Sequence, residues 1–123
     1  MHIVTTSRAP RAIGPYSQAI VANGFLFTSG QIPIDPVSGE IAGTDITTQA
    51  ERVMQNLSAV LEAAGVTFAD AVKTTCFLAT MEDFAAFNAV YERYFVGKPA
   101  RSCVAVKTLP KNVLCEVEVV AVA

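Results

Sequence analysis

The chain has 123 residues, of which 52% are hydrophobic and only 16% are charged, and its net charge is −2. This length favours a single domain, residues 1–123, with a substantial core. The charge balance argues against a nucleic-acid-binding surface, and no apolar run is long enough to cross a membrane. The first residues show neither a signal peptide nor a transit peptide pattern, so we expect a cytoplasmic protein. The apolar excess indicates that other subunits cover part of the surface.

The cysteine and histidine content limits the kinds of catalytic and metal site that we expect. The three cysteines are widely spaced and contain no C-x-x-C pair, which argues against a zinc site or a redox pair and favours reduced thiols. The single histidine is His2, at the start of the chain. Catalytic triads, Cys–His pairs and histidine-rich metal sites are therefore not expected.

The first third of the chain has the pattern of short strands joined by stiff loops. A β-like piece at 3–5 precedes a loop with two prolines, and such a loop holds Tyr16 in a fixed place. Residues 18–29 predict a hairpin, because two apolar segments flank an Asn-Gly pair, the strongest short hairpin signal. Gly30 then ends the second strand and permits close approach of the backbone. Turn residues follow, out to position 43.

Residues 46–64 predict an amphipathic helix, because apolar residues recur at steps of three and four. Asp45 or Thr47 can cap its start, and Gly65 is a natural stop. The segment 71–79 is rich in β-branched residues, which is typical of a strand.

A second helix is predicted to follow residues 80–83, which have the pattern of a capping box, and to run to about residue 95. Strands are expected at 99–106 and, after a turn, at 114–123. The element order β-ββ-α-β-α-β-β indicates an α+β fold in which a mixed sheet carries two helices on one face. The other face must also be covered, and self-association is the simplest solution.

Two charged residues stand out in the last two strands. Arg101 lies in an apolar strand, where an unpaired guanidinium is costly. Either it pairs with Glu116 or Glu118 on a neighbouring strand, or it binds a ligand carboxylate, or it does both. Glu116 is either part of a solvated acidic edge or a functional carboxylate with a raised pKa.

Three further residues have both an ordinary and a functional interpretation, and a fourth has only an ordinary one. Tyr16 and Ser29 lie beside a proline and a glycine, and each is either a packed residue or part of a site wall. Cys103 is predicted to be an inert lining thiol, because no histidine is available to activate it. Asn88, a polar residue of the second helix, is interpreted as a local hydrogen-bonding or exposed residue.

Four short motifs follow one another along the chain: IGPYSQ at 13–18, FTSGQIP at 27–33, PARSCV at 99–104 and EVEVVAV at 116–122. Together they resemble the Rid (YjgF) family of reactive-intermediate imine deaminases. Some members of that family are named L-PSP endoribonucleases or translation inhibitors. The resemblance covers nearly the whole chain, and several separate motifs in the right order make it specific.

The resemblance implies a chorismate-mutase-like α+β fold and a homotrimer with three sites in the clefts between subunits. It also implies a 2-iminobutanoate/2-iminopropanoate deaminase, a hydrolase that acts on the C=N bond of reactive 2-imino and 2-enamino acids. Pyridoxal-phosphate dehydratases release these compounds, and their hydrolysis to 2-keto acids and ammonia limits metabolite damage. The resemblance implies that neither a metal nor a cofactor is needed.

Site residues follow from the matching motif positions. The resemblance implies that Arg101 binds the substrate carboxylate in a bidentate manner and that Glu116 holds the attacking water. Tyr16, from the neighbouring subunit, and Ser29 would close the pocket around the imine. An iminium carbon is already electrophilic, so positioning plus one proton relay suffices. The expected catalytic residues are Arg101, Glu116 and Tyr16, and the expected substrate-binding residues are Arg101, Ser29, Gly30, Cys103 and Tyr16, with Gly30 and Cys103 contributing backbone groups.

Two other functions remain as alternatives. An endoribonuclease or translation inhibitor is disfavoured by the acidic charge and the absence of a histidine pair. A non-catalytic trimer that binds metabolites is the second alternative.

The loop at 96–99 is shorter than in many members of the family and is expected to border the pocket, so it bears on substrate range. Cys115 replaces a more usual branched aliphatic residue, which we interpret as a packing change.

Overall fold

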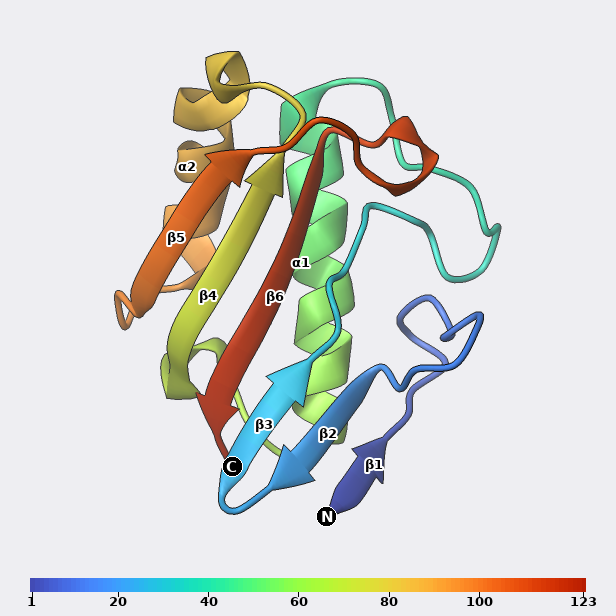
Figure 1. Cartoon of the computed structure of the whole chain (residues 1–123), viewed down its shortest axis with the longest axis vertical. Coiled ribbons are helices and arrows are strands. Elements are labelled where there is room, and N and C mark those ends of the chain that lie inside the picture. Colours follow the sequence, from blue (N-terminus) through green and yellow to red (C-terminus); the bar gives the residue numbers. More distant parts are fainter.

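The computed structural model describes residues 1–123 as one six-stranded sheet with two helices packed on one of its faces (Figure 1). The strand order is β1-β2-β3-β6-β4-β5, and every neighbouring pair is antiparallel except β4 and β5. The predicted mixed α+β fold is therefore confirmed. The strands are β1 (His2–Val4), β2 (Ala19–Ala22), β3 (Phe25–Thr28), β4 (Ala71–Leu78), β5 (Ala100–Ala105) and β6 (Cys115–Val122), and the helices are α1 (Ile46–Ala63) and α2 (Phe84–Tyr94).

The predicted hairpin is formed by β2 and β3. Ala22 pairs with Phe25 across the turn. The two turn residues, Asn23 and Gly24, have φ values of 53° and 79°. Positive φ at both positions is the type I′ geometry, whose twist matches that of the flanking strands.

The helix α1 begins and ends as predicted. Asp45, rather than Thr47, caps its start, because the Asp45 carboxylate accepts a 2.9 Å hydrogen bond from the backbone N–H of Thr48. Gly65 follows the end of the helix with a φ of 76°. Glycine is favoured there because a side chain is disfavoured in the left-handed region.

The capping box predicted before α2 is only half formed. The Thr80 hydroxyl accepts a 3.2 Å hydrogen bond from the backbone N–H of Glu82, but Asp83 makes no side-chain cap bond. Residues Met81–Asp83 form a 3₁₀ turn, and α2 begins at Phe84. The tighter turn brings the second N–H, rather than the third, to the threonine hydroxyl.

The core lies between the helices and the sheet. Cys115, Val117, Val119 and Ala121 of β6 are buried under the helices, as the alternation of this strand predicts, whereas Ala123 is exposed at its end. The intervening side chains of β6 project from the opposite face of the sheet. Burying one side of an alternating strand fixes its register, because a one-residue slip would expose the core residues.

The opposite face of the sheet carries exposed apolar side chains. Phe25, Phe27, Val104 and Val122 expose between 41% and 48% of their surface. Large apolar side chains gathered on one face mark an interaction surface more often than an ordinary solvated surface. Neither helix has the length and apolarity to cross a membrane.

Candidate functional site

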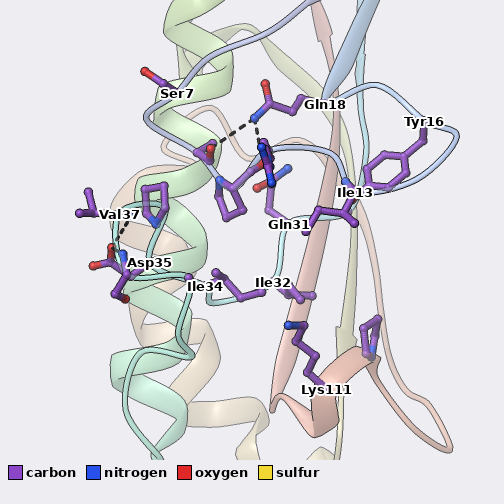
Figure 2. A pocket seen from close by; sticks show the side chains of 18 residues that line it. Ser7, Ile13, Tyr16, Gln18, Gln31, Ile32, Ile34, Asp35, Val37 and Lys111 are labelled. Carbon is purple, nitrogen blue, oxygen red and sulfur yellow. Dashed lines mark hydrogen bonds between the residues drawn. The ribbon is translucent and has the colours of Figure 1, made fainter.

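Three loops meet at one end of the sheet and surround a hollow of about 820 Å³ (Figure 2). They are the β1–β2, β3–α1 and β5–β6 connections. Of the predicted site residues, Tyr16 and Gly30 line this hollow. Arg11 and Lys111 add two cationic side chains to its wall, and Figure 2 shows Lys111 projecting toward Ile32 of the facing loop.

The carboxyl group of Glu116 lies directly against Gly30. Glu116 is half-buried on the open face of β6, where it pairs with Phe77 of β4. A Cβ atom at position 30 would overlap Oε2 of Glu116, so only glycine fits without displacing the carboxyl group. Gln31 exchanges backbone hydrogen bonds of 2.8 and 3.1 Å with Val117, which fixes the Gly30 backbone beside β6.

The environment of Glu116 changes its acidity. Burial raises the pKa of Glu116 above its ordinary value, and the negative charge of Glu118 raises that pKa further. A carboxyl group with a raised pKa is better matched to exchanging protons with water near neutral pH. The half-buried position and the raised pKa favour the functional interpretation of Glu116 over that of a solvated acidic edge.

The two hydroxyl residues of the predicted site differ in their surroundings. The Ser29 hydroxyl donates a 2.6 Å hydrogen bond to the carbonyl of Ser17, and its backbone N–H donates to the carbonyl of Gln18. Ser29 therefore ties the end of β3 to the N-terminal loop. Tyr16 is 54% exposed, and its hydroxyl accepts a 3.4 Å hydrogen bond from the N–H of Ile13. Its ring stands at the rim of the hollow, as Figure 2 shows.

Two buried polar side chains that were not predicted as functional hold these loops in place. The Gln18 amide accepts from the N–H of Thr6 at 2.7 Å and donates to the Thr6 carbonyl at 3.0 Å. Asn56 of α1 donates to the carbonyls of Ile32 and Ile34 at 3.1 and 3.0 Å. A polar residue inside the apolar stripe of the predicted helix 46–64 was the available signal for Asn56.

Arg101 lies on the other side of the sheet. Its Nη1 donates a 2.6 Å hydrogen bond to Oδ1 of Asn88, and its guanidinium carbon lies 4.7 Å from the ring centre of Tyr91. Of the alternatives for Arg101, the one in which it pairs with Glu116 or Glu118 is wrong within one subunit. The strand β4 separates β5 from β6, and the alternation of side chains puts the arginine on the helix face and the two acids on the open face.

Cys103 projects from the same face of the sheet as Arg101, the face that the helices cover. It lies opposite Cys76 in the register of the parallel strands β5 and β4, and both thiols are free. Burial raises the pKa of the Cys103 thiol, and burial likewise raises the pKa of Cys76 to about 12. Since the thiolate is the nucleophilic form, both residues are poor nucleophiles. These surroundings support the interpretation of Cys103 as an inert lining thiol.

The loop that follows α2 lies beside Arg101. Lys98 and Pro99 line a shallow hollow of about 340 Å³ together with Asn88, Glu92 and Arg101. The 96–99 loop therefore lies beside Arg101, and its position at the border of a substrate pocket stays a prediction. The fold brings together no group of three or more His, Cys, Asp or Glu residues that could hold a metal ion.

The predicted site residues therefore form two groups within one subunit. The first lies beside the large hollow and on the open face of β6, and the second lies on the helix face of β5. The first group is Tyr16, Ser29, Gly30 and Glu116, and the second is Arg101 and Cys103.

The model of the family described as endoribonuclease L-PSP matches residues 6–123. The chain belongs to the endoribonuclease L-PSP family. Proteins that it matches carry the names Rid, YjgF and RutC, so membership of the Rid (YjgF) family is confirmed. A RutC family protein from Synechocystis is 54% identical, covering 99% of this chain and 96% of the relative. A 2-iminobutanoate/2-iminopropanoate deaminase from Salmonella typhimurium is 46% identical, covering 97% of this chain and 95% of the relative.

Solved structures of Rid family proteins share the fold described above. A Thermotoga maritima protein superposes with a TM-score of 0.97 at 51% identity, covering 100% of this chain and 98% of that one. E. coli TdcF, whose crystal structure contains bound serine, superposes with a TM-score of 0.95 at 43% identity, again over 100% of this chain and 99% of that one.

Proposed function

We propose that this Rid family protein is a cytoplasmic 2-iminobutanoate/2-iminopropanoate deaminase. It would hydrolyse reactive 2-imino and 2-enamino acids to 2-keto acids and ammonia, with no metal or cofactor taking part. The observation that carries the proposal is the Glu116 carboxyl group, held half-buried against Gly30 with a raised pKa. The name of the S. typhimurium relative supports the reaction, and the serine bound to TdcF supports a small amino-acid-like ligand.

The proposed chemistry needs one anion-binding group and one proton relay. The guanidinium of Arg101 binds the substrate carboxylate and orients C2 of the iminium group. The carboxylate of Glu116 holds a water molecule and accepts one of its protons as the water oxygen bonds to C2. That proton then passes to the amine nitrogen. As the C–N bond breaks, the Glu116 carboxylate takes the remaining proton of the C2 hydroxyl, so that the C2 carbonyl forms, and the departing ammonia carries this proton away as ammonium.

A site that uses both residues requires more than one subunit. Arg101 and Glu116 project from opposite faces of the sheet within one chain. We therefore propose a homotrimer in which Arg101 and Cys103 of one subunit meet Glu116, Gly30, Ser29 and Tyr16 of the next. The exposed apolar residues on the open face and the unpaired edge of β5 support such an assembly.

The test couples this protein to a threonine dehydratase and follows 2-oxobutanoate release. We expect clear acceleration over the spontaneous hydrolysis of the imine. If the wild-type protein gives no acceleration, the proposed function is wrong.

Substitutions in the same assay distinguish carboxylate binding by Arg101 from proton transfer by Glu116. Arg101→Ala is expected to lower kcat/KM by about 10- to 100-fold, since it removes charge-assisted hydrogen bonds to the carboxylate. Glu116→Gln is expected to lower kcat with little change in KM, because it keeps the shape and removes the proton acceptor. Arg93→Ala, which removes a surface arginine paired with Glu51, is the matched control and should leave kcat/KM unchanged. Equal activity of Arg101→Ala and wild type would refute the site.

The family description names endoribonuclease activity as the other candidate. The net charge of −2 disfavours it. RNA cleavage that persists through repeated purification and is abolished by Arg101→Ala would support it. Tight binding of 2-keto acids without turnover would instead support a non-catalytic trimer that binds metabolites.

A further inference from the structure

Three side chains of α2 surround the guanidinium group of Arg101. Asn88 accepts its 2.6 Å hydrogen bond through Oδ1, and the rings of Tyr91 and Phe84 have their centres 4.7 and 5.5 Å from its guanidinium carbon. Positions 84, 88 and 91 are spaced by four and three residues, so they lie along one face of the helix. We call these three residues the α2 cradle.

The α2 cradle is rigid because its central ring is fixed from two directions. The Tyr91 hydroxyl shares a buried 2.7 Å hydrogen bond with Oγ1 of Thr74 on β4. The same ring stacks on Phe95, with ring centres 4.5 Å apart and planes tilted by 25°. Tyr91 is only 8% exposed. The arginine therefore rests on a surface that is ordered by the core rather than by other surface side chains.

Every member of the α2 cradle is electrically neutral. The two ion pairs within the chain join Arg8 to Glu62 and Arg93 to Glu51, and neither includes Arg101. The amide oxygen of Asn88 orients the guanidinium without cancelling its charge, and an aromatic face attracts a cation without neutralising it. An arginine held in this way keeps its full charge and its remaining N–H donors for an anion.

We infer that Asn88 and Tyr91 are positioning residues that hold Arg101 in a fixed orientation, unpaired with any carboxylate of its own subunit, and thereby select ligands with a free carboxylate. This inference deepens the proposed function, since it concerns the same arginine. It is tested by ligand binding, which does not depend on turnover.

The test uses 2-oxobutanoate as the carboxylate ligand and 2-oxobutanamide as its neutral counterpart, with affinities measured by calorimetry or NMR titration. Asn88→Asp places a carboxylate against the guanidinium, and we expect the affinity for 2-oxobutanoate to fall by about tenfold or more, with little change for the amide. Asn88→Ala removes the orienting bond but adds no charge, so its loss should be smaller, about threefold. Asn23→Asp, the same substitution at an exposed position of the β2–β3 turn, is the charge-changing control and should leave the binding of both ligands unchanged.

The relative losses of affinity in the two Asn88 variants distinguish a positioning role from a purely structural role. A purely structural role for Asn88 would make the alanine variant at least as damaging as the aspartate variant and would weaken both ligands alike. Tyr91→Phe, which keeps the ring but loses the bond to Thr74, is expected to weaken 2-oxobutanoate binding without unfolding the protein, as checked by circular dichroism.

Unchanged carboxylate binding by Asn88→Asp, or no carboxylate binding by the wild type, would overturn the inference. The wild type could bind 2-oxobutanoate, with a larger loss of affinity in Asn88→Asp than in Asn88→Ala, and still not accelerate imine hydrolysis. In that case the inference about Asn88 and Tyr91 holds, and the proposed deaminase activity is wrong. The two failures are therefore distinguishable.

Discussion

Gly30 and Glu116 form a contact in which one residue has no side chain so that the other can keep its position. The backbone of Gly30 is fixed to β6 through its neighbour Gln31, so the glycine cannot move away. The atom that a Cβ would meet is at the far end of a flexible glutamate side chain. A larger residue would therefore displace the carboxyl group before it distorted the backbone.

Gly30→Ala is accordingly expected to reduce imine hydrolysis at least tenfold while changing the thermal midpoint by only about 1–3 °C. Activity and thermal unfolding measured on the same sample check this expectation. Gly65→Ala, after the end of α1, is the matched control: nothing lies within 4 Å of its added methyl, so it should keep full activity although its positive φ lowers stability. A fully active Gly30→Ala variant would show that the position of the Glu116 carboxyl group is unimportant.

The raised pKa of Glu116 predicts a pH-dependent effect on stability. Because burial raises this pKa, the folded protein holds the proton more tightly than the unfolded chain, and ionisation costs stability as the pH rises above the ordinary carboxyl value. Glu116→Gln avoids this cost. We expect its midpoint to exceed that of the wild type by about 1–3 °C at pH 7, an effect limited by solvent screening, and to match it near pH 3.5.

Thermal unfolding from pH 3.5 to pH 8 measures this difference. Glu40→Gln, at an exposed position, is the control and should follow the wild type. A Glu116→Gln variant that is less stable than the wild type at pH 7 would mean that the carboxylate makes a stabilising interaction instead.

At the scale of elements, α1 organises the loops as well as the core. Its buried face includes Gln49 and Asn56 among apolar residues. Gln49 accepts a 2.8 Å hydrogen bond from the N–H of Leu114 and donates to the carbonyl of Gly43, so it joins the β3–α1 and β5–β6 connections. Buried amides that satisfy loop backbone groups replace the ladder bonds that irregular segments lack.

Asn56→Ala should loosen the β3–α1 connection, because it leaves the Ile34 carbonyl without a partner and removes one of the two hydrogen bonds to the Ile32 carbonyl. We expect a loss of about 1–3 kcal/mol in unfolding free energy and faster amide hydrogen exchange in residues 31–43. Chemical denaturation and exchange measured by mass spectrometry provide the two readouts. Gln55→Ala, at the neighbouring exposed position, should change neither, and equal exchange in both variants would contradict the anchoring role.

At the scale of the whole molecule, one face of the sheet is covered by helices and the other is not. A sheet that is apolar on both faces is stable in water only when both faces are covered. The exposed phenylalanines of β3 lie on the uncovered face, distant in sequence from the exposed valine of β5. The proposed trimer covers that face and joins the two groups of site residues at the same time.

Phe27→Lys tests this link, since it places a charge on the uncovered face without touching the core. We expect light scattering to report three times the 13.0 kDa chain mass for the wild type and a smaller mass for the variant, with parallel loss of imine hydrolysis. Lys107→Ala, at an exposed loop position, is the control. A monomeric wild type with full activity would rule out a site shared between subunits.

The local elements and the family could be recognised from contiguous stretches of the sequence. The Asn-Gly hairpin, the start and end of α1 and the alternation of β6 depend on residues adjacent in the chain, and the family motifs are contiguous segments, so all of them could be predicted. Strand order and register became known only from the folded structure: β4 lies between β5 and β6, and the register places Arg101 and Glu116 on opposite faces of the sheet. Strand order depends on pairings between distant segments, for which no local pattern exists. The same reason explains why the α2 cradle around Arg101, built by a different element, was not predicted.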